Sequence, residues 1–238
     1  MGSSTTRVVV GEFLKGEKNP KIIGVGEAPA LGLRHGYVVN PTLALASLKQ
    51  ALSGAEKTSG IKIKRAFVAV GGVTLRGDIS LGETIVSKAD GEITHLDIDR
   101  VLEDSENNLN LNNKKVIQVF PLSFKLDGKE ILGRPEGMRG TKLEVKALFV
   151  TCSSQHLEDL LTVIDEAGIR PIDVIPAPIA GSRIALTEKQ KVVGSALVDI
   201  GSETVSAAVF ENGLLSSLYT FSIGGADVTN DIALGLKI

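Results

Sequence analysis

Residues Leu197–Leu215 read LVDIGSETVSAAVFENGLL, in which a group of small polar residues separates two apolar runs. The Asn212-Gly213 dipeptide near the end favours a tight turn, so the stretch predicts a hairpin-like pair of strands. A bend rich in Gly and Ser exposes backbone N–H groups that can bind anionic oxygens. The polar break at 199–204 is therefore a candidate phosphate-binding loop, and a plain hairpin turn is the alternative.

Two kinds of ligand are present in this break. Asp199 ends the first apolar run, where its carboxylate suits a hydrated Mg²⁺ that neutralises phosphate charge. The bend that follows supplies backbone and hydroxyl donors from Gly201, Ser202, Glu203 and Thr204. D-x-G-x-x-T is a short pattern, so a second copy in the chain would strengthen the interpretation.

The chain opens with MGSSTTRVVV, which again places small polar residues before an apolar strand. The Gly-x-x-Thr spacing at Gly2–Thr5 repeats that of Gly201–Thr204, and a strand ending in Asp before Met1 would complete the match. A remnant of an expression tag is the alternative origin of Met1–Ser4. Two such bends in two related domains would hold a polyphosphate from opposite sides.

The remaining pattern predicts an α/β protein. Strands are expected at 6–13, 20–26 and 64–70, with a helix from Pro41 that Asn40 caps and Gly60 ends, which together favour a mixed sheet covered by helices. Residues 77–150 resemble a compact α+β insertion, with a helix at 95–106 and strands at 116–126 and 143–150. A helix at 155–167, a strand at 169–176 and a helix at 179–186 follow, and the chain stops within a further helix.

Composition excludes several classes of protein. The formal net charge is −2 without a basic stripe, so no nucleic-acid surface is expected. One cysteine and three scattered histidines form neither a disulfide framework nor a metal cluster. Cys152 is expected to be a packed small residue and His156 a surface residue of its helix. No apolar run approaches the roughly 18 residues of a membrane span.

Longer stretches resemble the FtsA family of bacterial cell-division proteins, within the actin-like ATPase superfamily. They are 22–39 (IIGVGEAPALGLRHGYVV), 120–150 (FPLSFKLDGKEILGRPEGMRGTKLEVKALFV) and 223–232 (IGGADVTNDI). The resemblance implies actin-like (ribonuclease H-like) mixed-sheet domains with an inserted α+β subdomain of the SHS2 or 1C type, truncated at both ends. It divides the chain into subdomain 1A (1–76 with 151–190), subdomain 1C (77–150) and part of subdomain 2A (191–238).

The same resemblance implies a site and partners. ATP with Mg²⁺ would bind between Gly2, Ser3, Ser4 and Thr5 on one side and Asp199, Gly201, Ser202, Glu203 and Thr204 on the other, with Asp199 nearest the metal through water. The full-length relative would form filaments and, as a peripheral protein at the cytoplasmic face of the membrane at the division site, link it to the FtsZ ring. The subdomain that binds the FtsZ C-terminal tail would lie outside this chain, and residues 77–150 would contact other division proteins.

Three expectations qualify this interpretation. No residue stands out as a general base, so the resemblance implies a scaffold with at most weak ATPase activity, and this chain alone is expected to bind ATP weakly or not at all. Glu203 brings a negative charge to the second bend, which suits phosphate only if its carboxylate points outward. The alternatives are a PilM-like protein of type IV pilus assembly and a sugar-kinase-type phosphotransferase.

Overall fold

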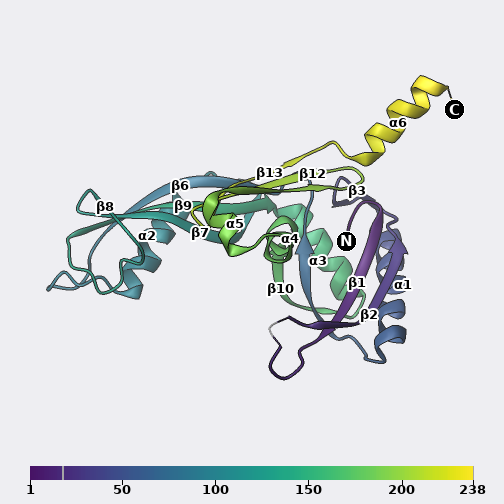
Figure 1. Cartoon of the computed structure of the whole chain (residues 1–238), viewed down its shortest axis with the longest axis horizontal. Coiled ribbons are helices and arrows are strands. Elements are labelled where there is room, and N and C mark those ends of the chain that lie inside the picture. Colours follow the sequence, from purple (N-terminus) through teal and green to yellow (C-terminus); the bar gives the residue numbers. More distant parts are fainter. Residues whose placement is uncertain (18, 238) are drawn as a thin grey trace.

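The computed structural model describes residues 1–17 and 19–237 (Figure 1). Strands β1 (Thr5–Glu12) and β2 (Lys21–Pro29) form the predicted antiparallel pair, and helix α1 (Pro41–Ser59) packs against it. The Asn40 side chain accepts a hydrogen bond of 3.1 Å from the Leu43 N–H, and Gly60 ends the helix at a φ of 71°. Both ends of α1 are therefore confirmed, because a capping side chain and a left-handed glycine are local signals.

Strands β5 (Arg65–Val70) and β10 (Arg170–Pro176) pair in parallel. Parallel and antiparallel pairing are both present, as the sequence predicts, but β1 with β2 and β5 with β10 form two separate pairs rather than one continuous sheet. A cavity of about 270 Å³ lies between β1 and β5. Its lining is largely apolar and includes Val8, Val9 and Val68.

The insertion forms a sheet of its own. Its elements are β6 (Arg76–Ile85), α2 (His95–Asn107), β7 (Lys114–Leu126), β8 (Lys129–Ile131) and β9 (Lys142–Ser153). The strand order is β6-β9-β7-β8, with every pair antiparallel, and α2 packs on β6 and β9. Figure 1 shows this sheet extending to the left of the body that holds β1, β2 and α1. It does not continue the first pair of strands.

The chain then returns through α3 (Ser154–Glu166) and β10 to α4 (Ala177–Ala185) and the short α5 (Glu188–Val193). A three-stranded antiparallel sheet follows, with strands β11 (Ser195–Ile200), β12 (Val205–Glu211) and β13 (Leu214–Phe221). The sequence predicts only a pair of strands here, whereas the structure has three. The polar break joins β11 to β12, and Asn212-Gly213, at φ values of 52° and 79°, joins β12 to β13.

Helix α6 (Gly225–Leu236) ends the described chain and projects outward in Figure 1. None of its residues is buried. None of the helices within residues 1–17 and 19–237 has the length and hydropathy needed to cross a membrane.

Three groups of buried side chains hold these elements together. The first lies between α1, α3 and β5, and the third lies under α2 in the inserted sheet. The second joins β9 to α4, β12 and β13, and it contains Leu148, Cys152, Ile179 and Leu218. Cys152 is fully buried there, and burial raises the pKa of its thiol to about 11. It is the packed residue that the sequence predicts, because a buried protonated thiol is a poor nucleophile.

Candidate functional site

The two Gly-x-x-Thr bends have the same internal hydrogen bond. The Gly2 N–H donates to the Thr5 carbonyl at 3.1 Å, and the Gly201 N–H donates to the Thr204 carbonyl at 2.9 Å. A Cβ atom added to Gly2 would lie 3.2 Å from the Thr5 carbonyl oxygen, and one added to Gly201 would lie 3.0 Å from the Thr204 carbonyl oxygen. Both bends are therefore tight. The repeat seen in the sequence is therefore a repeat of geometry as well.

Both bends border one cavity of about 670 Å³. Eight of the nine predicted site residues line it: Gly2, Ser3, Ser4, Thr5, Asp199, Gly201, Ser202 and Thr204. Gly71, Gly72, Ala177 and Pro178 add a wall from the ends of β5 and β10. Segments about 200 positions apart in the sequence thus lie around a single space.

The ninth predicted residue, Glu203, does not line the cavity in the described chain. Its carboxylate accepts a hydrogen bond of 2.6 Å from the His35 N–H, and its backbone carbonyl lies 3.0 Å from His35 Nδ1. This hydrogen bond orients the Glu203 charge toward the β3–β4 hairpin and not toward the cavity.

His35 belongs to a hairpin that was not predicted from the sequence. Strands β3 (Leu33–Arg34) and β4 (Tyr37–Val38) are joined by His35-Gly36, at φ values of 49° and 84°. Two successive residues at positive φ are typical of a type I′ turn. The only local signal is Gly36 between Leu33-Arg34 and Tyr37-Val38, and it is weak because each strand has only two residues.

A polar row crosses the sheet beside the second bend. Asp199 pairs with Ser206 on β12, Ser206 pairs with Thr220 on β13, and all three line the cavity. Thr220 Oγ1 is buried and has no hydrogen-bond partner within the described chain. A buried hydroxyl without a partner costs free energy, so this position is suited to a polar ligand or an ordered water. Neither Ser206 nor Thr220 is among the site residues predicted from the sequence.

The second bend is supported by the start of α6. The Gly225 N–H donates to the Gly201 carbonyl at 2.9 Å, and the Ala226 N–H donates to the Ser202 carbonyl at 2.8 Å. A Cβ atom on Gly224 would lie 2.4 Å from the Ser202 carbonyl oxygen, so the helix start packs closely on the bend. The predicted segment 223–232 thus contributes to the site by fixing this bend.

Charged side chains are few at the cavity. Asp199 is the only carboxylate residue and Arg7 the only basic residue that line it in the described chain. Arg7 also forms an ion pair with Glu27. No group of three or more His, Cys, Asp or Glu residues that could hold a metal occurs within residues 1–17 and 19–237. A cation here would therefore need oxygen ligands from a bound anion and from water in addition to Asp199.

His156 lies beside the same hairpin, and its predicted surface position is wrong. The side chain is buried, and its ring packs against that of Tyr37 with a centroid distance of 4.6 Å. Burial lowers the pKa of His156, although the backbone of Gly36 and the charge of Asp159 act in the opposite direction. The helix pattern alone could not reveal this, because the residues around the ring, which include Tyr37 of β4 and Thr74, are distant in the sequence.

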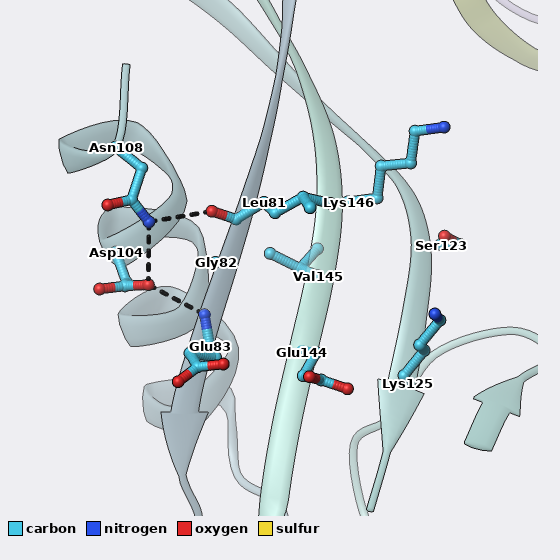
Figure 2. Close-up of a pocket in the computed structure, with 10 residues that line it drawn as sticks. All are labelled: Leu81, Gly82, Glu83, Asp104, Asn108, Ser123, Lys125, Glu144, Val145 and Lys146. Atoms are coloured by element: carbon cyan, nitrogen blue, oxygen red, sulfur yellow. Dashed lines mark hydrogen bonds between the residues drawn. The ribbon is translucent and has the colours of Figure 1, made fainter. Parts of the chain in front are cut away.

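A second cavity, of about 360 Å³, lies on the inserted sheet (Figure 2). At its rim, α2 protects the outer edge of β6. The Glu83 N–H donates to Asp104 Oδ2 at 2.9 Å, and the Asn108 side-chain N–H donates to the Leu81 carbonyl at 3.0 Å. These side chains take the place of a neighbouring strand, which discourages edge-to-edge pairing at this point.

Solved structures with a similar fold define the class of this protein. A chain of the PilM–PilN type IV pilus biogenesis complex aligns with a TM-score of 0.70 and 16% identity, over 100% of this chain and 64% of that one. The ethanolamine utilization protein EutJ of Carboxydothermus hydrogenoformans aligns with a TM-score of 0.54 and 16% identity, over 100% and 55% of the two chains. The fold, with its cavity between two matched bends, is actin-like.

Within that class, the sequence matches one family. The model of the SHS2 domain inserted in FtsA matches residues 72–151, and the model of cell division protein FtsA matches residues 196–238. FtsA of Bacillus subtilis is 34% identical over 237 residues, and FtsA of Pseudomonas aeruginosa is 32% identical over the same length. The chain belongs to the FtsA family. The two alignments cover 100% of this chain but only 53% and 56% of the length of those relatives.

Proposed function

We propose that this chain is the part of an actin-like cell-division scaffold that binds the polyphosphate of ATP together with Mg²⁺. The observation that carries the proposal is the pair of bends with one hydrogen-bond pattern on two sides of a 670 Å³ cavity. Membership of the FtsA family supports it, because the family belongs to the actin-like ATPases. The unpartnered Thr220 hydroxyl and the tight glycine bends fit an anionic ligand.

The proposed roles follow from the donors on each side. Backbone N–H groups and hydroxyls of Gly2, Ser3, Ser4 and Thr5 would bind phosphate oxygens from the first domain, and those of Gly201, Ser202 and Thr204 from the second. Asp199 would hold Mg²⁺ through water, and the ion would neutralise phosphate charge. We assign Glu203 a positioning role instead of a phosphate contact, since its carboxylate accepts from His35.

The cavity favours binding over catalysis. Asp199 is the only carboxylate residue that lines it in the described chain, and the proposed metal role leaves no second acidic group there to act as a general base. A sugar kinase needs such a base beside its acceptor, so this composition argues against that alternative. At most a weak ATPase activity is proposed. The affinity of this chain alone for ATP is proposed to be weaker than micromolar.

The whole protein's activities are proposed from the family. The chain spans about half the length of the curated relatives that it matches. We propose that the complete protein forms filaments, binds the C-terminal tail of FtsZ and lies at the cytoplasmic face of the membrane at the division site. The separate inserted sheet, with its own cavity and a protected edge, is the proposed surface for other division proteins.

A role in pilus assembly is the alternative that the fold suggests. The pilus complex shares the fold at 16% identity, whereas the FtsA relatives reach 34%. Sequence likeness therefore favours cell division. Mixing the protein with an FtsZ tail peptide or with a pilus peptide, and measuring binding to each, would separate the two roles.

The nucleotide proposal is tested by NMR titration of the ¹⁵N-labelled chain with ATP, with and without Mg²⁺. The expected result is a set of shift changes in the amides of 2–5 and 201–204, larger when Mg²⁺ is present. Asp199→Asn is expected to weaken the Mg²⁺-dependent binding about tenfold, or about 1.4 kcal/mol. Asp231→Asn, in the exposed face of α6, is the matched control and should behave as wild type.

Two results would contradict the nucleotide proposal. One is the absence of any change at either bend up to millimolar MgATP. The other is a response confined to the inserted sheet, around the cavity of Figure 2.

A further inference from the structure

The tip of the β3–β4 hairpin contacts both bends. The Gly36 N–H donates to Ser3 Oγ in the first bend at 3.1 Å. The adjacent His35 N–H donates to the Glu203 carboxylate in the second bend at 2.6 Å. His35 Nδ1 lies 3.0 Å from the Glu203 carbonyl, which can only accept, so Nδ1 carries the hydrogen. Two consecutive residues therefore connect bends that lie about 200 positions apart.

The tip is itself fixed to the first domain. The Val73 N–H donates to the His35 carbonyl at 3.2 Å, and a Cβ atom on Gly36 would lie only 2.4 Å from the Cα of Gly72. On the next residue, Tyr37 packs against the buried ring of His156. Because the tip is hydrogen-bonded to Val73 and lies close to Gly72, it links the position of this part of the chain to that of Glu203.

We infer that His35, Gly36 and Glu203 form a clasp that holds the two phosphate-binding bends at one spacing across the cleft. Glu203 is a positioning residue in this clasp. The inference rests on the proposed function for its meaning, since a fixed spacing matters only if one ligand spans both bends. The clasp itself is a property of the protein without ligand.

The clasp also orients a ligand group. Ser3 Oγ accepts the Gly36 N–H, so its own hydrogen remains available to donate toward the cavity that Ser3 lines. On the other side, the hydrogen bond to His35 directs the Glu203 charge away from that cavity. Apparent affinity for a ligand falls in proportion to the fraction of molecules that have the competent spacing. Loss of the clasp should therefore weaken binding without removing any phosphate contact.

The test measures the spacing directly, in the protein without nucleotide. Spin labels are placed on Gln50→Cys in α1 and Ser217→Cys in β13, both exposed positions, while the fully buried Cys152 stays unlabelled. Double electron–electron resonance then gives the distance distribution between the two halves. Wild type is expected to show one narrow distribution, and Glu203→Ala a broader or displaced one.

A graded series separates the clasp from a general loss of structure. Glu203→Gln keeps an oxygen acceptor for the His35 N–H and should give an intermediate width. His35→Asn keeps a residue suited to positive φ and loses only the ring contact, so its effect should be smaller than that of Glu203→Ala. Glu211→Ala, on the exposed end of β12, is the matched control. Circular dichroism confirms that each variant is folded.

The same variants are titrated with MgATP. About tenfold weaker binding is expected for Glu203→Ala if nine-tenths of the molecules lose the competent spacing. Identical distance distributions in wild type, Glu203→Ala and Glu211→Ala would overturn the clasp. Absence of MgATP binding in wild type would overturn the proposed function instead, and the distance measurement would still decide whether the clasp exists.

Discussion

The side chain of Glu203 points to His35 because of a contact between residues 168 positions apart. The sequence places this carboxylate in the second bend but cannot give its direction, since both a phosphate-facing and an outward-facing rotamer fit the same local pattern. What decides between them is the His35 backbone N–H at the tip of a hairpin far away in the sequence. Residue identity is thus readable from the sequence, whereas side-chain direction depends on the partner.

His156 illustrates the same dependence through burial. Its backbone N–H, in the first turn of α3, lies 3.5 Å from the Ser153 hydroxyl, and this contact between neighbours in the sequence can be predicted. Its ring packs against Tyr37 of β4, and this contact between distant residues cannot. Nε2 has no hydrogen-bond partner within the described chain. A buried neutral imidazole with a lowered pKa makes the folded state sensitive to acid.

The first prediction concerns this sensitivity. Because the folded-state pKa of His156 is lowered, the unfolded state binds a proton more readily, and stability is lost as the pH falls through the ordinary value of about 6.5. Urea unfolding at about pH 7.5 and about pH 5.5 should therefore show a smaller loss for His156→Gln than for wild type. His95→Gln, at an exposed histidine, is the control. Equal losses in wild type and His156→Gln would contradict the prediction.

At the scale of elements, the sequence is most informative where signals are local. Helix α1 has a capping asparagine, a proline in its first turn and a glycine beyond its end, and it forms where these residues place it. The β3–β4 hairpin was missed because each of its strands has only two residues, so its stability comes from packing rather than from its own pattern. Strand β13 follows the Asn212-Gly213 turn, which is a local signal, but only one pair of strands was predicted there.

The N-terminus of α2 supports a second prediction. Asp97 is fully buried, which by itself would raise its pKa. Hydrogen bonds from the Thr94 hydroxyl and N–H and from the Ser87 N–H outweigh burial and hold the pKa of Asp97 well below its ordinary value. The ionised carboxylate therefore stabilises the fold at neutral pH, and this contribution is lost as the pH falls below about 4.

Asp97→Asn is expected to lower the free energy of unfolding by about 1–3 kcal/mol at neutral pH, since the hydrogen bonds to a charged group are replaced by weaker ones. The difference from wild type should shrink on acidification. Asp99→Asn, an exposed position on the same helix, should change stability by less than about 0.5 kcal/mol. Chemical denaturation followed by circular dichroism measures both, and a difference for Asp97→Asn that grows at low pH would contradict the assignment.

At the scale of the whole molecule, the candidate site depends on how distant segments meet. Both bends could be predicted, because Gly-x-x-Thr and the preceding Asp199 are contiguous patterns. Ser206 and Thr220 could not, since they reach the cavity only through the register of β11, β12 and β13. The inserted sheet was predicted as a separate unit. Its packing through β9 against the β11–β13 sheet could be seen only in the structure.

That attachment leads to the last prediction. Leu218 on β13 and Leu148 on β9 belong to one buried group, so the inserted sheet and the β11–β13 sheet share a core. Leu218→Ala should cost about 2–5 kcal/mol. Hydrogen exchange should then be faster in β11–β13 and also in β9, because both sheets lose the shared contact. Leu143→Ala removes an equally buried leucine from the inserted sheet's own core and should affect that sheet alone. If exchange in Leu218→Ala rises only in β11–β13, the two sheets are not coupled through this core, and the spacing between the bends would depend on the clasp without support from the packed interface.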